Sequence, residues 1–471
     1  MRRTKIICTI GPASENAKTL KGLCEAGMNV ARLNFSHGTH EEHKNKIDLI
    51  KSVRKELSLP IAIMLDTKGP EYRIGVFENK KANIPDGQIF TFTTEEITGN
   101  ENRVSVSYKD LPKEVSVGDR ILVNNGLLIF EVIDLNETEI ICSTISGGIL
   151  SDKKSMNFPN HVMRGEYLSE ADKSDLLFGI ENDVDFVAAS FVSNRGDIES
   201  VRRFLDENGG ENIDLIAKIE NRSGVLNIDE ICEVADGIMV ARGDLGVEIP
   251  YMELPAVQKH LIKRCRLLGK RVITATEMLE SMITNPRPTR AEISDVANAV
   301  YDGSSAIMLS GETASGKYPV EAVSTMAKIA LYTEENIDYK KRFRDTDYVI
   351  KNSLDAVSHS TCAMAINTNA KGIVISSLSG VTVRMVSRFR CPVDIIGMTT
   401  NEKAWRKLNL SWGVIPVMSE EFNSVDVMFY HAFRYAKEVF GLEPGDNVVL
   451  TGGQISGKSG NTNTIRLETV S

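Results

Sequence analysis

The sequence of 471 residues predicts an α/β protein with three parts: a TIM (β/α)8 barrel, an all-β domain inserted into the barrel, and a C-terminal α/β domain. Three observations predict this fold. Short apolar runs alternate with longer segments of helical periodicity, which is typical of βαβ units around a parallel sheet. Between residues 70 and 167 the pattern changes to alternating apolar and polar residues. After a charged run at residues 340–345, the alternation of strands and helices starts again.

The barrel is expected to comprise residues 1–69 and 168–340, where helical segments separate eight apolar runs. Ser14 is expected to cap the first helix, Gly27 to end it, and Thr289–Glu292 to form a capping box. A TIM barrel carries its chemistry at the carboxyl ends of its strands. The expected strands are Lys5–Ile10, Val30–Asn34, Ile61–Asp66, Phe186–Ser190, Leu215–Ile219, Gly237–Ala241, Val272–Thr276 and Ala306–Ser310.

The insertion, residues 70–167, follows the third barrel strand and is expected to be a β-barrel-like domain. At the catalytic face it would act as a lid that excludes water. Its expected strands are Ile89–Thr93, Arg103–Tyr108 and Ile121–Val123, with turns at Gly87, Gly118 and Asn125-Gly126. Residues 341–471 have the size of a separate domain. Its expected strands are Gly372–Ser377, Val393–Met398, Gly413–Val417 and Asn447–Thr451.

Composition excludes several classes of function. The net charge of −9 argues against bulk nucleic-acid binding. No apolar run approaches the roughly 18 residues that cross a bilayer, and Ile6–Ile10 is too short for a signal peptide. The seven cysteines occur singly, which predicts free thiols in a reducing cytosol rather than disulfides or a zinc site. We expect a cytoplasmic protein without a membrane or nucleic-acid partner.

Lys218, Glu220 and Asp244 stand at or just beyond the ends of two consecutive strands. Side chains at i and i+2 of a strand point to the same face, so Lys218 and Glu220 aim together. A cation beside two hard oxygen ligands suits a magnesium ion that also touches phosphate. The alternative for Lys-x-Glu alone is an ion pair that caps the barrel.

The second and third strands end in further polar segments, Arg32–Gly38 and Asp66–Arg73. Each segment alone could be a polar turn, and His37 by itself is more typical of a turn than of acid–base catalysis. Together they offer oxygen ligands and forked cations, which suit a metal and a phosphate. The oxygen ligands are Asn34, Ser36, Asp66 and Thr67, and the cations are Arg32 and Arg73.

Two other segments need an interpretation. Thr276 could hold a substrate or water by its hydroxyl, or it could cap a helix. Gly452–Ser459 satisfies the P-loop expression G-x-x-x-x-G-K-S. A P-loop must open a helix, whereas the segment that follows, Thr464–Leu467, is expected to be a strand. We therefore reject a nucleoside-triphosphatase site, although the loop can cradle another phosphate.

Seven motifs, in their order along essentially the whole chain, resemble pyruvate kinase of the bacterial type without an extra C-terminal domain. The motifs are Thr4–Ser14, Arg32–Gly38, Asp66–Arg73, Lys218–Glu220, Ala241–Pro250, Ala275–Met282 and Pro286–Glu292. The resemblance implies transfer of a phosphoryl group from phosphoenolpyruvate to ADP, giving pyruvate and ATP in the last step of glycolysis. It also implies Mg²⁺ (or Mn²⁺) and K⁺ as cofactors.

The resemblance also implies roles for single residues. Glu220 and Asp244 would bind magnesium, and Lys218 would stabilise the phosphoryl group in flight. The implied potassium ligands are Asn34, Ser36, Asp66 and Thr67, with Glu71 as the residue typical of potassium-dependent members. The implied catalytic and substrate residues are Arg32, Gly243, Asp244 and Thr276, with Thr276 near the route of proton delivery. The implied nucleotide residues are Asn34, Phe35, Ser36, His37, Arg73 and Lys154.

The chain departs from the family pattern at three places, all in the inserted domain. Asn124 and Asn125 stand where two aspartates are usual, which puts a lid carboxylate in doubt. Ser155 and Asn160 replace glycines around Lys154, and Tyr72 replaces an aliphatic residue.

The loop Ser377–Thr382 resembles the one that binds a sugar-phosphate activator in many family members. The effector residues would be Ser377, Ser379, Gly380 and Thr382, ahead of an expected helix at Val383–Phe389. The alternative is a capped helix without a ligand, and the sequence does not name the effector, a sugar phosphate or a nucleotide. Family members are mostly homotetramers, so the resemblance implies a homotetramer.

Two rival functions differ in testable ways. A magnesium-dependent barrel aldolase or lyase would also use a lysine and two carboxylates to stabilise an enolate, but it would need no ADP. A catalytically idle sugar-phosphate sensor would be expected to have lost Lys218, Glu220 or Asp244, and the chain keeps all three.

Overall fold

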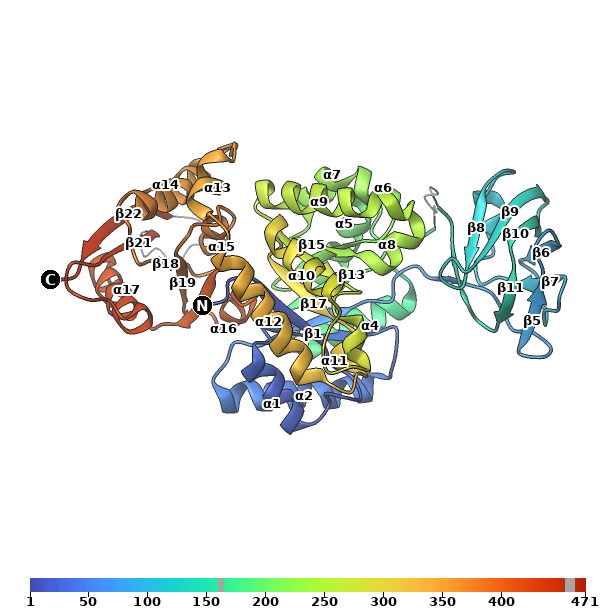
Figure 1. Cartoon of the computed structure of the whole chain (residues 1–471), viewed down its shortest axis with the longest axis horizontal. Coiled ribbons are helices and arrows are strands. Elements are labelled where there is room, and N and C mark those ends of the chain that lie inside the picture. The colour runs from blue at the N-terminus through green and yellow to red at the C-terminus, as the bar shows by residue number, and fades with distance from the viewer. Residues whose placement is uncertain (160–164, 454–461) are drawn as a thin grey trace.

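The computed structural model describes residues 1–159, 165–453 and 462–471. Three parts lie in a row along its long axis (Figure 1). The barrel occupies the middle, the inserted β domain lies at one end, and the C-terminal domain lies at the other.

The barrel closes through eight parallel strands in the order β1-β17-β16-β15-β14-β13-β3-β2. Each strand end lies within one residue of the position predicted from the sequence, because buried parallel strands are read as continuous apolar runs. The strands are β1 (Lys5–Thr9), β2 (Val30–Asn34), β3 (Ala62–Asp66), β13 (Phe186–Ala189), β14 (Asp214–Ile219), β15 (Gly237–Ala241), β16 (Arg271–Ala275) and β17 (Ala306–Leu309).

Helices surround the barrel, and their caps differ in one respect from the prediction. Asn16, not Ser14, caps the first helix, because its side chain accepts from Thr19 N whereas Ser14 Oγ accepts from Gly11 N in the preceding turn. Gly27 ends this helix with a φ of 118°, as predicted. The capping box at Thr289–Glu292 is confirmed.

The barrel helices are α1 (Ala17–Ala26), α2 (His40–Leu57), α4 (Glu170–Glu181), α5 (Arg195–Glu207), α6 (Arg222–Leu226), α7 (Ile228–Val234), α8 (Arg242–Glu248), α9 (Leu254–Leu268), α10 (Arg290–Asp302), α11 (Gly311–Ala314) and α12 (Pro319–Glu335). Two short 3₁₀ helices, η1 (Tyr251–Glu253) and η2 (Glu280–Ile283), lie in the loops after β15 and β16.

Apolar side chains fill the barrel as a packed core, not a pore. Large residues such as Phe186, Met239 and Met308 point inward and are buried. Leu410 of the C-terminal domain belongs to the same cluster, so it closes the amino-terminal end of the barrel. Polar chemistry is therefore confined to the opposite end, where the strands finish.

The inserted domain is all-β, as predicted. Its main sheet has the order β4-β12-β8-β9-β10-β6-β7, and β11 pairs with β5. Phe90, Phe92 and Phe130 form its own buried core. Its elements are β4 (Tyr72–Arg73), β5 (Lys81–Ile84), β6 (Ile89–Thr93), β7 (Arg103–Ser105), α3 (Leu111–Glu114), β8 (Arg120–Val123), β9 (Leu128–Leu135), β10 (Glu139–Ser146), β11 (Gly148–Ser151) and β12 (Ser155–Asn157).

The C-terminal domain has a five-stranded sheet in the order β20-β19-β18-β21-β22, in which only β22 is antiparallel. Apolar clusters cover both faces of this sheet. Its elements are α13 (Tyr339–Asp345), α14 (Ser353–Asn367), β18 (Gly372–Ser376), α15 (Val381–Ser387), β19 (Asp394–Thr399), α16 (Glu402–Leu408), β20 (Val414–Met418), α17 (Val425–Phe440), β21 (Asn447–Gly453) and β22 (Thr462–Thr469).

Helix α16 docks this domain onto the amino-terminal end of the barrel through buried ion pairs. Arg406 Nε lies 2.7 Å from Asp185 Oδ1, and Lys407 Nζ lies 2.7 Å from Asp214 Oδ1. Asp185 and Asp214 stand just before or at the start of β13 and β14. The C-terminal domain and the β domain therefore contact opposite ends of the barrel.

Candidate functional site

Lys218 lies at the centre of a buried polar cluster at the carboxyl end of the barrel. Its Nζ lies 3.0 Å from Asp66 Oδ1, 2.6 Å from Ser190 Oγ and 3.0 Å from Glu220 Oε1. Burial lowers the pKa of Lys218, but attraction by Asp66 and Glu220 outweighs it, so this pKa lies above its ordinary value. Lys218 is thus a fixed positive charge, and it points to the same side as Glu220, as the i, i+2 spacing predicts.

Glu220 is fully buried and has one oxygen without a hydrogen bond. Its Oε2 accepts from the backbone N–H of Phe191 at 2.6 Å. Its Oε1 lies near Lys218 but makes no hydrogen bond. Burial raises the pKa of Glu220 to about 7, with a further upward contribution from Asp244, although Lys218 lowers it. A buried carboxylate in this state is stabilised by any added cation.

Asp244 and Gly243 lie in the first turn of α8, directly after β15. The backbone N–H of Gly243 donates to Thr276 Oγ1 at 2.8 Å, which joins the ends of β15 and β16. Thr276 and Glu277 have left-handed φ angles of 67° and 52°, and no helix begins there. The helix-cap alternative for Thr276 is therefore wrong.

The ends of β2 and β3 bring together the four predicted oxygen ligands. Asn34 and Asp66 are register partners on these neighbouring strands, Ser36 lies two residues after Asn34, and Thr67 follows Asp66 directly. Asn34 Oδ1 accepts from the backbone N–H of Ser36 at 3.2 Å. Arg32 Nε donates to Asp66 Oδ2 at 2.6 Å, so Arg32 belongs to the Lys218 cluster through Asp66.

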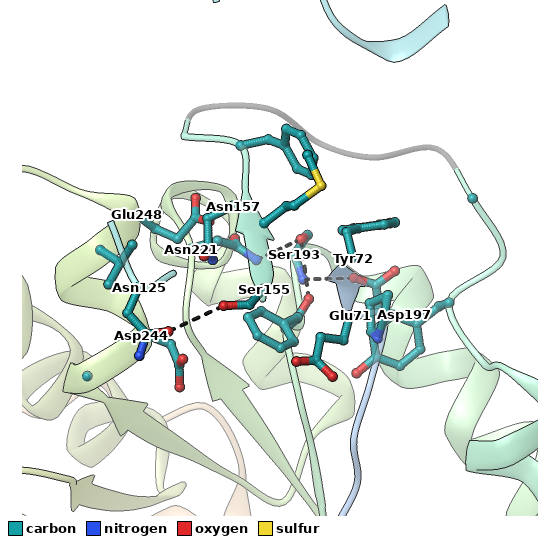
Figure 2. Close-up of a pocket in the computed structure, with 18 of the residues that line it drawn as sticks. Glu71, Tyr72, Asn125, Ser155, Asn157, Ser193, Asp197, Asn221, Asp244 and Glu248 are labelled. Carbon is teal, nitrogen blue, oxygen red and sulfur yellow. Dashed lines mark hydrogen bonds between the residues drawn. The ribbon is translucent and has the colours of Figure 1, made fainter. Parts of the chain in front are cut away.

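A cavity of about 460 Å³ opens between the barrel end and the β domain (Figure 2). Asp244 and Gly243 line it from the barrel, and Asn125 and Ser155 line it from the β domain. Glu71, at the crossing between the two domains, also faces it. Glu71 pairs with Arg73 and lies 3.5 Å from Lys68, yet its Oε2 is buried without a hydrogen bond.

A second cavity, of about 580 Å³, lies beside the ends of β1 and β2. Asn34 and His37 line it, together with Pro12 and Lys46. Phe35 does not: its ring is buried and stacks on His43 with the centroids 3.9 Å apart. Of the predicted nucleotide residues, Asn34 and His37 thus face open space, whereas the Phe35 side chain serves packing.

Arg73 and Lys154 come from the β domain. Arg73 Nη1 donates to the carbonyl of Lys153 at 2.7 Å. The backbone carbonyl of Lys154 accepts a hydrogen bond from the backbone N–H of Ile74. Asn124 and Asn125 have positive φ angles, 57° and 56°, a conformation in which asparagine is found more often than most residues. Asn160 lies outside the described residues.

The sequence comparisons agree along the whole chain. The family description "Pyruvate kinase, barrel domain" matches residues 1–323, and "Pyruvate kinase, alpha/beta domain" matches residues 355–468. The chain belongs to the pyruvate kinase family. It is similar to the pyruvate kinase of Clostridium acetobutylicum, with 47% identity over all of both chains. It is 46% identical to that of Geobacillus stearothermophilus over 100% of this chain and 81% of the relative.

A solved pyruvate kinase from Cryptosporidium parvum has the same fold, with a TM-score of 0.95 and 38% identity over 100% of this chain and 96% of that one. The prediction of the family, the barrel, the inserted all-β domain and the C-terminal α/β domain is confirmed. Within the described residues, no helix is long and apolar enough to cross a membrane.

The loop that resembles the family's effector loop differs in detail from the prediction. The helix begins at Val381 rather than Val383, so Thr382 lies in its first turn instead of ahead of it. Thr382 Oγ1 is buried and lies 2.7 Å from Thr462 Oγ1. Ser377 and Ser379 remain in the loop, and Gly380 has a φ of 75°. Residues 454–459 of the P-loop-like segment Gly452–Ser459 lie outside the described residues. The expected strand Thr464–Leu467 falls within β22, which begins at Thr462.

Sequence reasoning missed several residues that hold the site together. Arg242 Nη2 donates to the carbonyls of Thr276 and Glu277 at 2.6 and 2.9 Å and so fixes their left-handed turn. Asp295 of α10 pairs with Arg242 at 2.7 Å. The position of Arg242 next to Gly243-Asp244 could have suggested a role in the site. Its hydrogen-bond partner, the carbonyl of Thr276, lies 34 positions away and could not be identified from the sequence.

Proposed function

We propose that this chain is a pyruvate kinase that transfers the phosphoryl group of phosphoenolpyruvate to ADP, giving pyruvate and ATP. The observation that carries the proposal is Lys218, a buried cation beside two carboxylates at the barrel mouth, in a chain 47% identical over its full length to a curated pyruvate kinase. Phosphoryl transfer asks mainly for positioning and charge neutralisation, and this cluster offers both.

Glu220 and Asp244 would hold Mg²⁺ or Mn²⁺. The residues fit such an ion, because Glu220 Oε1 is buried without a hydrogen bond and both donors are hard oxygens. Within the described residues no group of three or more metal-binding side chains occurs. Two carboxylates match Mg²⁺ sites in which substrate phosphate and water complete the coordination. The ion would neutralise negative charge on the substrate phosphate and carboxylate.

Lys218 would stabilise the phosphoryl group during transfer. Its ammonium stays charged, because Asp66 and Glu220 keep its pKa high. Asp66 also orients the Arg32 guanidinium, which we assign to the substrate phosphate. The phosphoryl group leaves the enolate oxygen of phosphoenolpyruvate and bonds to the terminal phosphate oxygen of ADP, which leaves enolpyruvate in the site.

Gly243 and Thr276 would position the substrate, and Thr276 lies on the proposed route by which enolpyruvate receives a proton. The hydroxyl of Thr276 donates to the Ala275 carbonyl at 2.6 Å and accepts from Gly243 N, which fixes its orientation. Thr276 thus holds a defined place beside Gly243 and Glu277, which line the 460 Å³ cavity, and its hydroxyl could order a water molecule there.

The nucleotide would bind across Asn34, Ser36 and His37, beside the 580 Å³ cavity, with Arg73 and Lys154 approaching from the β domain. Phe35 would act through its backbone and by packing. Asn34, Ser36, Asp66 and Thr67 would hold K⁺, because one carboxylate among neutral oxygens suits a singly charged ion. Glu71 would select for K⁺, because its carboxylate adds a negative charge at the domain crossing, and its Oε2, 3.5 Å from Lys68 Nζ, makes no hydrogen bond.

Further parts of the proposal extend beyond the barrel mouth. We assign residues 1–69 and 168–340 to the catalytic barrel, 70–167 to the lid and 341–471 to a regulatory domain. Ser377, Ser379, Gly380 and Thr382 would contact a phosphorylated effector, a sugar phosphate or a nucleotide. We propose a cytoplasmic homotetramer, as is usual in the family.

The test is a lactate-dehydrogenase-coupled assay of pyruvate formation from phosphoenolpyruvate, with ADP, Mg²⁺ and K⁺ omitted in turn. The proposal expects turnover to vanish without ADP or Mg²⁺ and to fall sharply without K⁺. Pyruvate formation without ADP would instead support a lyase or phosphatase, and no pyruvate under any condition would support the sensor alternative.

A further inference from the structure

Glu248 connects the barrel to the inserted β domain. Asn157, the last residue of β12, donates from Nδ2 to Glu248 Oε1 at 3.0 Å. The backbone of Phe158 also hydrogen-bonds to the Glu248 carboxylate. Figure 2 shows Asn157 and Glu248 next to each other at the cavity wall. Glu248 is only 8% exposed, so a charged hydrogen bond at the domain junction is shielded from water.

The β domain makes a second contact at the neighbouring residue. A Cβ atom built on Gly126 would lie 3.4 Å from Val247 Cγ1, so the turn at Asn125-Gly126 rests against Val247. Asn125 Oδ1 also accepts from Ser155 Oγ at 3.3 Å, which ties this turn to the strand that carries Asn157. A turn and a strand of the β domain thus meet two consecutive residues at the end of α8.

Helix α8 carries Asp244 one turn before Glu248. Residues four apart in an α-helix lie on the same face, and both side chains line the cavity. The helix has only seven residues, and its first, Arg242, is held by Asp295 and by the turn after β16. A displacement of Glu248 would tilt this short helix about its anchored start and so move Asp244.

We propose that Glu248 is a positioning residue that latches the β domain onto α8, so that the lid position and the placement of Asp244 are set together. The role of Asp244 rests on the proposed function, whereas the latch itself rests on the contacts of Asn157, Gly126 and Val247. The latch gives the lid a mechanical route to the metal-binding carboxylate without a direct contact to substrate.

The first test measures the position of the lid by pulsed electron paramagnetic resonance. Spin labels at Glu137→Cys in the β domain and Glu207→Cys in α5 react selectively, because all seven native cysteines are buried. We expect Glu248→Ala to broaden the distance distribution, and Glu248→Gln to preserve it because the amide oxygen still accepts from Asn157. Glu253→Ala, in η1 and paired with Arg222, is the matched control and should match wild type. An unchanged distribution in Glu248→Ala would overturn the latch.

The second test is a double-mutant cycle in kcat/KM and in the Mg²⁺ activation constant. Loss of one charged hydrogen bond corresponds to roughly a tenfold fall in kcat/KM for Glu248→Ala or for Asn157→Ala. The double variant should fall no further than Glu248→Ala, because that substitution already removes the bonds from Asn157 and from the Phe158 backbone, and the Mg²⁺ constant should rise in parallel. Additive losses would overturn the proposal. Since the spin-label distances need no turnover, a broadened distribution in a protein without ADP-dependent activity would refute the proposed function and leave the latch standing.

Discussion

Replacing Lys218 by methionine tests the centre of the proposed mechanism. Methionine keeps most of the side-chain length but removes the charge that lies 3.0 Å from Asp66 Oδ1 and from Glu220 Oε1. A positioned charged donor in a buried site stabilises a transition state by about 3–4 kcal/mol. At about 1.4 kcal/mol per factor of ten, we expect kcat to fall by roughly 10²–10³.

The variant should still fold, because neither carboxylate next to Lys218 is left as an unpaired buried charge. Asp66 keeps its bonds from Arg32 at 2.6 Å and from Ser190 at 3.3 Å. Glu220 already has a pKa raised to about 7 by burial, and loss of Lys218 raises it further, so Glu220 can take up a proton instead of remaining as an unpaired charge. We expect a loss of about 1–3 kcal/mol in the free energy of unfolding.

The assay is the coupled measurement of pyruvate formation, with circular dichroism and thermal melting on the same preparation. Lys259→Met is the matched control: this exposed lysine of α9 pairs with Asp302, away from the barrel mouth. A kcat for Lys218→Met within tenfold of wild type, in a folded protein, would refute the role of the lysine. A variant that fails to fold would refute the reasoning about Glu220.

Three further predictions concern other charged side chains. Glu71→Lys should place an ammonium where K⁺ is needed. We expect the ratio of kcat with K⁺ to kcat without K⁺ to fall by about tenfold or more, which corresponds to about 1.4 kcal/mol. An unchanged K⁺ activation curve would show that Glu71 is not the selector. Burial lowers the pKa of Lys5 to about 7. The unfolded chain therefore binds more protons than the folded one between about pH 7 and pH 10, so raising the pH stabilises the folded state. From pH 7 to pH 9, the free energy of unfolding of wild type, measured with urea, should rise by about 2 kcal/mol relative to that of Lys5→Met. Equal differences at both pH values would contradict the buried, neutral Lys5. Arg406→Met should remove the closest cation from the buried Asp185 carboxylate, which keeps the Ile63 N–H and Arg54 at 4.0 Å. We expect the free energy of unfolding to fall by about 1–3 kcal/mol and the denaturation midpoint to fall with it. An unchanged midpoint would mean that Arg54 alone is enough to stabilise Asp185.

The barrel was predictable because each of its strands can be recognised from a short stretch of sequence. Each barrel strand is a short run of apolar residues between helical segments, and each end was placed to within one residue. The cap of α1 was not, because Ser14 and Asn16 are both good cap residues and only the turn at Gly11 decides between them. The start of helix α15 was also missed: the helix begins at Val381, two residues before the predicted Val383, because Val381 and Thr382 give no clear start signal in the sequence.

The candidate site was predictable as far as barrel geometry brings strand ends together. Lys218 and Glu220 share one segment, and Asp66 joins them because β3 and β14 both flank β13. The partners that hold these residues were not predictable, because they depend on contacts between distant segments. Ser190 meets Lys218 across 28 positions, and Asn157 meets Glu248 across 91. Neither separation leaves a periodic pattern in the sequence.

Strand β14 contains both a residue whose role was predicted from the sequence and a residue whose partners could not be predicted. At its end, Lys218 lies in the buried polar cluster with Asp66 and Glu220, and the Lys218–Glu220 motif was recognisable from the sequence. At its start, Asp214 pairs with Arg271 at 2.6 Å and with Lys407 of α16 at 2.7 Å. These partners lie 57 and 193 positions away, so the sequence gives no sign of them. The C-terminal domain therefore docks on the opposite end of the same strand that carries Lys218.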